Sequence, residues 1–265
     1  MAATVAAVFP AATGILPASP RSRVKRGLGI TTNEASQWRE KLKASGARWF
    51  YSWGSMPPEN IPAAIEFVPM VWGGKPDDSF TKLGERLRTA GYQQLLGLNE
   101  PDNKEQSNVT VEDALSLWPK LMDTGLRLGC PACVHPDGEW MKAFMKGVEE
   151  RHLRVDFVTV HSYGGLSVDA FMNQLASVHK LFNRPIWITE FAVGDWEAKT
   201  RADNRYNPGQ IMKFVEQVLP RLEGCDFVER YAWFPADPDN KALGSSALFN
   251  EDGSLTPVGQ AYRSI

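Results

Sequence analysis

Two glutamates in this sequence stand where a strand is expected to end. Glu100 follows the apolar run Leu95–Leu98 and precedes a proline, which cannot continue the hydrogen-bond ladder of a strand. Glu190 interrupts a second apolar run, between Ile188 and Phe191, and a carboxylate in such a place must be paired, hydrogen-bonded or functional. Hydrolysis of a glycosidic bond requires two carboxyl groups: one protonates the leaving oxygen, and the other attacks the anomeric carbon or activates water.

The rest of the chain predicts how these acids are positioned. From Gly27 onward, short apolar runs alternate with amphipathic stretches of helical spacing, which is typical of repeated strand–helix units. The expected strands are 27–31, 48–53, 67–72, 95–98, 127–130, 157–161, 186–190 and 230–234. The expected helices are 34–44, 80–90, 111–123, 139–151, 168–182 and 208–222, with a last one after Pro257. Residues 57–65 are too rich in proline for a long helix.

Eight such units predict a single-domain α/β protein of the (β/α)8 TIM barrel class, for which about 250 residues are typical. The two glutamates lie 90 positions apart, or three units, so we expect them at the ends of strands 4 and 7. Both would then face the C-terminal mouth of the barrel, where barrel enzymes carry out their chemistry. An open doubly wound sheet is less favoured, because the segment after Gly27 lacks the third glycine of a phosphate-binding loop.

Two polar side chains at the end of the sixth strand belong to the same predicted site. His161 and Tyr163 lie on the strand next to the one that carries Glu190, so either can reach its carboxylate. A hydrogen bond from the imidazole or the phenol would keep Glu190 ionised, as a nucleophile requires.

Nine tryptophans are many for this length, and several stand at strand ends. Indole rings stack on the apolar C–H faces of pyranose sugars. Trp53, Trp72 and Trp233 are therefore expected to line a sugar-binding cleft. Trp49 and Tyr51 alternate with Trp53 along one strand, so all three share a face, part of which must be core.

Four separated motifs support a closer assignment. They are Phe50-Tyr51-Ser52-Trp53, Phe67-Val68-Pro69-Met70-Val71-Trp72-Gly73, Leu98-Asn99-Glu100-Pro101-Asp102 and Leu255-Thr256-Pro257-Val258-Gly259. In this order, and with the glutamate of the seventh strand, they resemble glycoside hydrolase family 128, the compact clan A β-1,3-glucanases of fungi and bacteria. The resemblance runs from about Gly27 to the C-terminus.

The resemblance implies a role for each site residue. Glu100 would be the acid/base and Glu190 the nucleophile of a retaining double displacement. Asn99 would bind the sugar 2-hydroxyl, and Tyr163 would orient Glu190. This mechanism requires a raised pKa at Glu100 while Glu190 stays ionised, and it needs neither a metal nor an organic cofactor.

The function implied is that of an endo-β-1,3-glucanase acting on β-1,3-glucan polysaccharide and its oligosaccharides. Three alternatives stay open at this point: an exo-acting β-1,3-glucanase, hydrolysis of another β-linkage, and a non-catalytic β-1,3-glucan-binding protein on the same barrel. The paired glutamates speak against a pure binding protein, which needs no acid–carboxylate pair.

Composition excludes several other classes. With 29 basic and 31 acidic residues the net charge is −2, which argues against nucleic acid as a partner. No apolar run approaches the roughly 18 residues that a membrane span needs. The lone pair Cys130 and Cys133 lacks the second pair of a structural zinc site, so a local disulfide or inert thiols are expected, with Cys225 as the odd cysteine.

The N-terminal segment 1–26 is expected to be processed or disordered, leaving 27–265 as the catalytic domain. Lys25-Arg26 resembles a dibasic cleavage site of a secreted precursor, and Asn108-Val109-Thr110 is an N-glycosylation sequon. We therefore expect a secreted or cell-wall-associated protein, active as a monomer.

Overall fold

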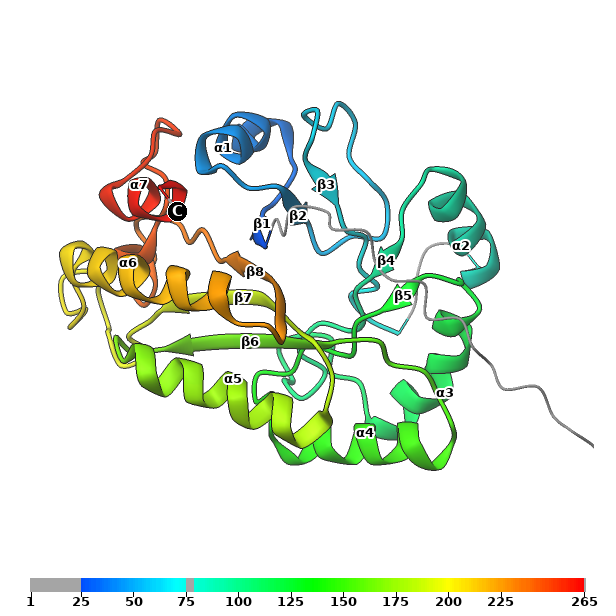
Figure 1. Ribbon diagram of the computed structural model, residues 1–265. Helices are drawn as coiled ribbons and strands as arrows, with labels where there is room; N and C mark the ends of the chain where they lie inside the picture. The colour runs from blue at the N-terminus through cyan, green and yellow to red at the C-terminus, as the bar shows by residue number, and fades with distance from the viewer. Residues whose placement is uncertain (1–24, 75–78, 265) are drawn as a thin grey trace, which may run out of the picture.

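The structure is a computed structural model that describes residues 25–74 and 79–264. Strands and helices alternate along the chain; the parallel strands form a central barrel, and the helices lie around it (Figure 1). The strands are β1 (Arg26–Gly29), β2 (Trp49–Tyr51), β3 (Glu66–Phe67), β4 (Gln94–Leu95), β5 (Arg127–Leu128), β6 (Val158–Gly164), β7 (Ile186–Val193) and β8 (Val228–Trp233). The α-helices are α1 (Trp38–Ser45), α2 (Phe80–Thr89), α3 (Val111–Met122), α4 (Glu139–Glu150), α5 (Val168–Phe182), α6 (Pro208–Gly224) and α7 (Pro257–Arg263), and two 3-10 turns are η1 (Glu34–Ser36) and η2 (Gly244–Ser246).

The strands form the ring that a (β/α)8 barrel needs, with two thin junctions. A six-stranded parallel sheet has the order β3-β2-β1-β8-β7-β6, and β4 pairs separately with β5. Single parallel bridges, Met70 to Leu96 and Gly129 to Phe157, connect the two pieces. The predicted fold class is therefore confirmed, although the hydrogen-bond ladder is reduced to one bridge on each side of the β4–β5 pair.

Most helices begin where the sequence predicts. The side chains of Ser79, Thr110 and Ser167 each accept a hydrogen bond from the backbone N–H three residues later, capping α2, α3 and α5. The predicted helix 34–44 is wrong as one element, because Gln37 has φ 51° and separates η1 from α1. Residues 57–65 form no helix, as their prolines predict. Among the helices described, none combines the length and the apolarity that a bilayer span requires.

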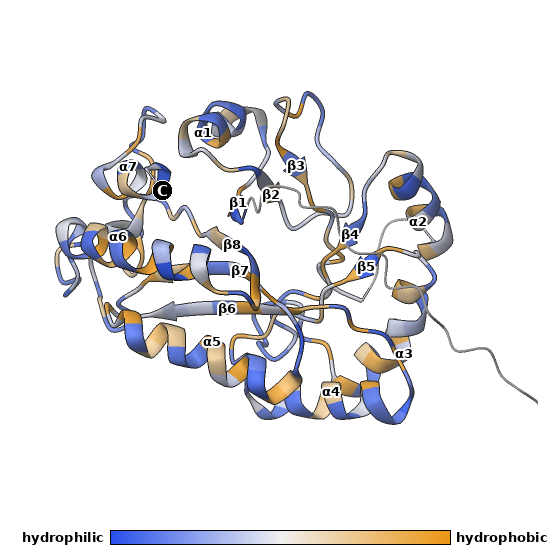
Figure 2. Ribbon diagram, in the orientation of Figure 1, coloured by the Kyte–Doolittle hydropathy of each residue, from blue (hydrophilic) through white to orange (hydrophobic). Residues whose placement is uncertain are grey.

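Side chains on both faces of the barrel strands are buried, the inner face inside the barrel and the outer face under the helices. Inward-facing side chains fill the barrel with an aromatic-rich cluster: Trp49, Tyr51, Val68, Met70, Leu96, Phe157, Trp187 and Ala232. Outward-facing side chains pack against the helices in a larger apolar layer. In Figure 2, α4 and α5 carry hydrophilic residues on their outer sides, so the helices shield the outer layer from water.

A β-bulge in β7 decides where Glu190 points. Against β6, Val160 pairs with Ile188 but His161 pairs with Glu190, so one residue of β7, Thr189, has no partner. The strand also shifts register against β8 within the segment from Ile188 to Phe191. In regular alternation, Glu190 would share the helix-facing side of Ile188. The extra residue reverses the alternation and turns Glu190 into the barrel.

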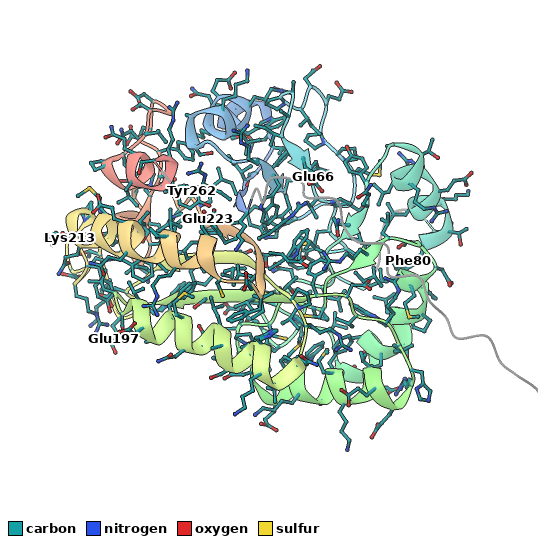
Figure 3. The ribbon with its side chains drawn as sticks, viewed as in Figure 1. Glu66, Phe80, Glu197, Lys213, Glu223 and Tyr262 are labelled. Atoms are coloured by element: carbon teal, nitrogen blue, oxygen red, sulfur yellow. The ribbon has the colours of Figure 1, made fainter. Side chains whose placement is uncertain are left out.

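Two residues before the predicted boundary at Gly27 belong to the fold. Lys25 is only 1% exposed. Its ammonium donates hydrogen bonds of 2.8–2.9 Å to three carbonyl oxygens at the end of α6, those of Leu222, Glu223 and Cys225. Glu223 is labelled in Figure 3 beside β8. The prediction that Lys25 and Arg26 lie outside the folded domain is therefore wrong, because Lys25 caps a helix end and Arg26 starts β1. Residues 1–24 lie outside the described residues.

We expect Lys25→Met to destabilise the protein by about 2–4 kcal/mol. The substitution keeps the apolar stem but leaves three helix-end carbonyls without their buried cationic donor. Urea denaturation measures the loss, with Lys43→Met, at an exposed position of α1, as the control. A destabilisation no larger than that of the control would contradict this role of Lys25.

The predicted local disulfide is absent. All three cysteines are free, and Cys130 and Cys133 are buried. Burial raises the pKa of the Cys130 thiol to about 11 and that of the Cys133 thiol well above its usual range. Both thiols therefore stay protonated at neutral pH and act as inert packing groups, the other alternative that the sequence left open.

Candidate active site

The carboxylate of Glu190 is held by hydrogen-bond donors from β2, from the residues just after it and from β6. Its Oε1 accepts from the Tyr51 hydroxyl at 2.7 Å and from the Trp53 indole N–H at 2.9 Å. Its Oε2 accepts a hydrogen bond from the Tyr163 hydroxyl. With Glu190 itself 5% exposed, these donors fix the orientation of the carboxylate. The predicted contact between Tyr163 and Glu190 is present.

Glu100 stands on the loop just after β4, at a backbone position that few side chains adopt. Its φ is 41°, and Trp53 on the other side of the mouth has φ 58°. Such left-handed conformations cost roughly 1–3 kcal/mol each and gather at functional sites. The Glu100 N–H bonds to the Ala132 carbonyl at 2.7 Å, and the amide of Asn103 lies 3.4 Å from Oε2. This loop therefore holds the acid over the barrel.

His161 lies between the two carboxylates. Its Nδ1 is 3.0 Å from Glu100 Oε1, and its Nε2 is 3.5 Å from Glu190 Oε1. One oxygen of each glutamate and a ring nitrogen of His161 lie within 4.8 Å of one another. The predicted pair therefore meets in space, and the 1% exposed imidazole is part of the same cluster.

This spacing would also suit three metal ligands. However, two phenols and an indole already donate to Glu190, and His161 Nδ1 already bonds to Glu100. The arrangement therefore fits proton transfer between hydrogen-bonded groups better than it fits a cation.

The electrostatics of Glu100 differ from the expectation. Burial alone raises its pKa, but the hydrogen bond and the charge of His161 outweigh it and lower the pKa below its usual value. Burial in turn lowers the pKa of His161, yet the charges of Glu190 and Glu100 raise it overall. The predicted raised pKa of Glu100 is thus wrong for the free protein, where the proton shared by the pair resides on the imidazole.

Asn99 is positioned by the same loop. Its amide nitrogen donates to Gln106 Oε1 at 3.2 Å, while its buried Oδ1 has no protein partner. An unpaired buried acceptor is costly unless a ligand satisfies it. A sugar hydroxyl can donate to this oxygen, which agrees with the expected role of Asn99. Gln106 gave no signal in the sequence, because loop contacts are set by the fold.

Of the three tryptophans predicted to line the cleft, Trp53 and Trp72 are accessible and Trp233 is buried. The partly buried Trp53 lies in a cavity beside Glu190, and Trp72 is 40% exposed. The prediction for Trp233 is wrong: it is 0% exposed, and its indole N–H binds the Ser246 carbonyl. It shares the helix-facing side of β8 with Tyr231, so alternation turns the next residue, Phe234, inward to contact Trp53.

Two cavities flank the glutamates. One of about 520 Å³ lies at the ends of β1 and β8 and is lined by Trp53, Phe234 and Asp237. The other, of about 550 Å³, lies on the β4–β6 side. Its lining residues are Glu100, Asn103, Val134, His135, His161, Ser162, Tyr163, Gly164, Gln174 and Trp196. Tyr51, Phe234 and Trp196 are the aromatic site residues that sequence reasoning did not assign.

Comparison with known proteins identifies the family. The family model described as "Glycosyl hydrolase catalytic core" matches residues 27–262. A subgroup I endo-β-1,3-glucanase of family 128 from Amycolatopsis mediterranei, in complex with laminaritriose, is 37% identical with a TM-score of 0.78. The alignment covers 91% of this chain and 99% of that one. The chain belongs to glycoside hydrolase family 128.

Other members of the family differ in their action. A subgroup III curdlan-specific exo-β-1,3-glucanase from Blastomyces gilchristii is 30% identical, over 92% of this chain and 99% of that one, with a TM-score of 0.72. A subgroup II endo-β-1,3-glucanase from Sorangium cellulosum is 26% identical, over 91% and 98%, with a TM-score of 0.72. No curated protein matches the chain. This family 128 protein is accordingly a glycoside hydrolase.

Proposed function

We propose that this family 128 hydrolase is a retaining endo-β-1,3-glucanase. The observation that carries the proposal is the approach of the two carboxylates, whose nearest oxygens lie within 4.8 Å. Retaining glycosidases hold their carboxyl groups about 5–5.5 Å apart, whereas inverting enzymes leave roughly 6.5–9.5 Å for a water molecule. The short gap favours direct attack by Glu190.

In the first step, Glu190 forms a bond to the anomeric carbon as the glycosidic C–O bond breaks. His161 Nδ1 first passes its proton across 3.0 Å to Glu100, which donates it to the leaving oxygen and is left ionised. In the second step, ionised Glu100 deprotonates a water that attacks the anomeric carbon and releases Glu190. Two inversions leave the β-configuration unchanged.

The relatives support β-1,3-glucan as the substrate. The Amycolatopsis enzyme was solved with laminaritriose, and its variants with a glutamate replaced by alanine or glutamine were solved with laminaripentaose and laminarihexaose. The Blastomyces relative is described as curdlan-specific. The members in three subgroups thus act on one linkage.

The shape of the mouth supports endo action. Cavities lie on both sides of the glutamates, so a chain can extend in both directions from the cleaved bond. Among the described residues, five large apolar side chains are exposed, and four of these follow the ends of β2, β3, β5 and β7: Met56, Trp72, Val134 and Trp196. Apolar groups gathered on one rim are typical of a binding surface.

Incubation with linear β-1,3-glucan tests the proposal. We expect a ladder of oligomers from the first minutes, and proton NMR should find the β-anomer first. A single short product from the start would mean exo action, as in the Blastomyces relative. Binding without release of sugar would instead indicate a glucan-binding protein.

We expect Trp196→Ala to raise KM for long β-1,3-glucan about 5–10-fold with a smaller change in kcat, because one sugar-stacking platform is worth roughly 1–1.5 kcal/mol. Trp196 is 63% exposed and lines the β4–β6 cavity. Leu181→Ala is the matched control, since Leu181 is also an exposed apolar residue but lies on α5. Equal KM values for the two variants would exclude Trp196 from the cleft.

We further propose that the protein works outside the cell, at cell-wall glucan. Asn108 of the sequon is exposed on a loop, where an oligosaccharyltransferase could reach it. A monomer suffices, because a single chain supplies every group of the site described. Mass spectrometry after glycosidase treatment of the secreted protein tests the modification, and analytical ultracentrifugation tests the monomer.

A further inference from the structure

Tyr51 holds the nucleophile from inside the barrel, where no sugar can reach. Its side chain is 0% exposed, yet its hydroxyl lies 2.7 Å from Glu190 Oε1. Burial and the nearby charge of Glu190 raise the pKa of the phenol well above its usual range. Tyr51 therefore remains a hydrogen-bond donor throughout the pH range of a hydrolase.

The ring of Tyr51 is wedged in place. It stacks on Trp49 below, with ring centroids 6.3 Å apart, and contacts Trp53 above at 5.0 Å. In the neighbouring strand, Gly29 is its register partner, and a Cβ there would come within 2.9 Å of the Tyr51 ring. A glycine at this place leaves room for the phenol and confines it.

The support continues to the floor of the barrel. Trp49 donates its indole N–H to the Lys25 carbonyl at 2.8 Å and packs against Trp187 at 5.5 Å. Across from it, a Cβ on Gly27 would come within 2.3 Å of the Trp49 indole. A column of aromatic rings, Trp49, Tyr51 and Trp53, thus runs along β2 and the residues just after it, from the Lys25 carbonyl to the carboxylate of Glu190.

We propose that Tyr51 is a positioning residue of the hydrolase, and that the aromatic column below it sets the orientation of Glu190. This inference rests on the proposed attack by Glu190. Tyr51 and Trp53 clamp Oε1 while Tyr163 clamps Oε2, so the carboxylate cannot rotate away from the anomeric carbon. Only Tyr51 does so without access to the substrate.

Tyr51→Phe tests the inference, because it removes the hydroxyl and keeps the ring. We expect kcat on β-1,3-glucan to fall about 10–100-fold, as for loss of a hydrogen bond to a charged group, with KM changed less than about twofold. The acid limb of the kcat profile should move to higher pH, because loss of a donor favours the protonated carboxyl. Tyr92→Phe, at a partly buried tyrosine outside the site, is the matched control.

Thermal melting of each variant separates positioning from folding. An unchanged kcat and pH profile in Tyr51→Phe would overturn the inference, and so would a loss of rate that only follows the fraction unfolded, with no movement of the acid limb. If the wild type itself released no sugar from β-1,3-glucan, the proposed function would fail. If the wild type is active, the comparison of Tyr51→Phe with Tyr92→Phe tests only the positioning role of Tyr51 and not the proposed function.

Discussion

Replacing Glu190 by alanine is expected to lower hydrolysis of β-1,3-glucan by about 10⁴-fold or more, the largest effect of any single change in this protein. The side chain supplies the bond-forming oxygen, and its three hydrogen-bond donors would face an empty space. Initial rates on the polysaccharide measure the loss. Glu197→Ala is the matched control, since Glu197 is an exposed acid on the loop after β7 and is labelled in Figure 3.

Azide distinguishes the roles of the two glutamates. In Glu190→Ala, azide can occupy the vacated space and attack an activated aryl β-laminaribioside once, so the product is the α-azide. In Glu100→Ala, azide attacks the ester on Glu190 as the second displacement, so the product is the β-azide. A β-azide from Glu190→Ala would refute its assignment as nucleophile.

His161→Asn is expected to reduce kcat/KM at pH 7 by about a hundredfold, the size typical of a lost proton-transfer group. In the free enzyme the pKa of His161 is raised and that of Glu100 is lowered, so the proton shared by the pair is lost at higher pH than from an ordinary histidine. Without the imidazole, only the hydrogen bond from Asn103 opposes the effect of burial on Glu100, so its pKa rises relative to the wild type. A carboxyl alone still releases its proton at lower pH than an imidazolium does.

The basic limb of the kcat/KM profile should therefore move to lower pH in His161→Asn, which a pH series from 4 to 9 would measure. His152→Asn, at an exposed histidine, serves as the control. The free energy of unfolding of the wild type should depend on pH as well. Because folding raises the pKa of His161, the protonated imidazole stabilises the folded protein below about pH 6.5, and this contribution is lost as pH rises through the folded-state pKa. A basic limb that stays at the same pH would disprove the role of His161 as the residue that holds the proton for Glu100.

The sequence predicts the placement of Glu100 and Glu190 because both depend on strand order, which follows from counting apolar runs. It fails where a single residue changes the face of a strand. Trp233 was expected in the cleft, yet alternation with Tyr231 turns it toward the helices and brings Phe234 inward. Nothing in Trp-Ile-Thr-Glu-Phe distinguishes a bulged strand from a regular one, so the inward turn of Glu190 had to come from pairing.

Contacts between residues that are far apart in the sequence could not be predicted either. His161 was expected near Glu190, but its shorter contact, 3.0 Å, is with Glu100. That contact reverses the expected shift in the pKa of Glu100, since a neighbouring cation outweighs burial. The roles of Gln106 and Tyr51 also depend on the three-dimensional fold. The loop after β4 brings Gln106 to Asn99, and closure of the barrel brings Tyr51 beneath Glu190.

The unpaired Thr189 makes the length of β7 adjustable at the site. Without that residue, Glu190 would directly follow Ile188, and regular alternation would turn it into the barrel opposite His161, as the bulge does now. A one-codon deletion at this place would therefore leave the nucleophile on the inner face of the strand. If Thr189 were instead drawn into the hydrogen-bond ladder, the alternation would turn Glu190 toward the helices.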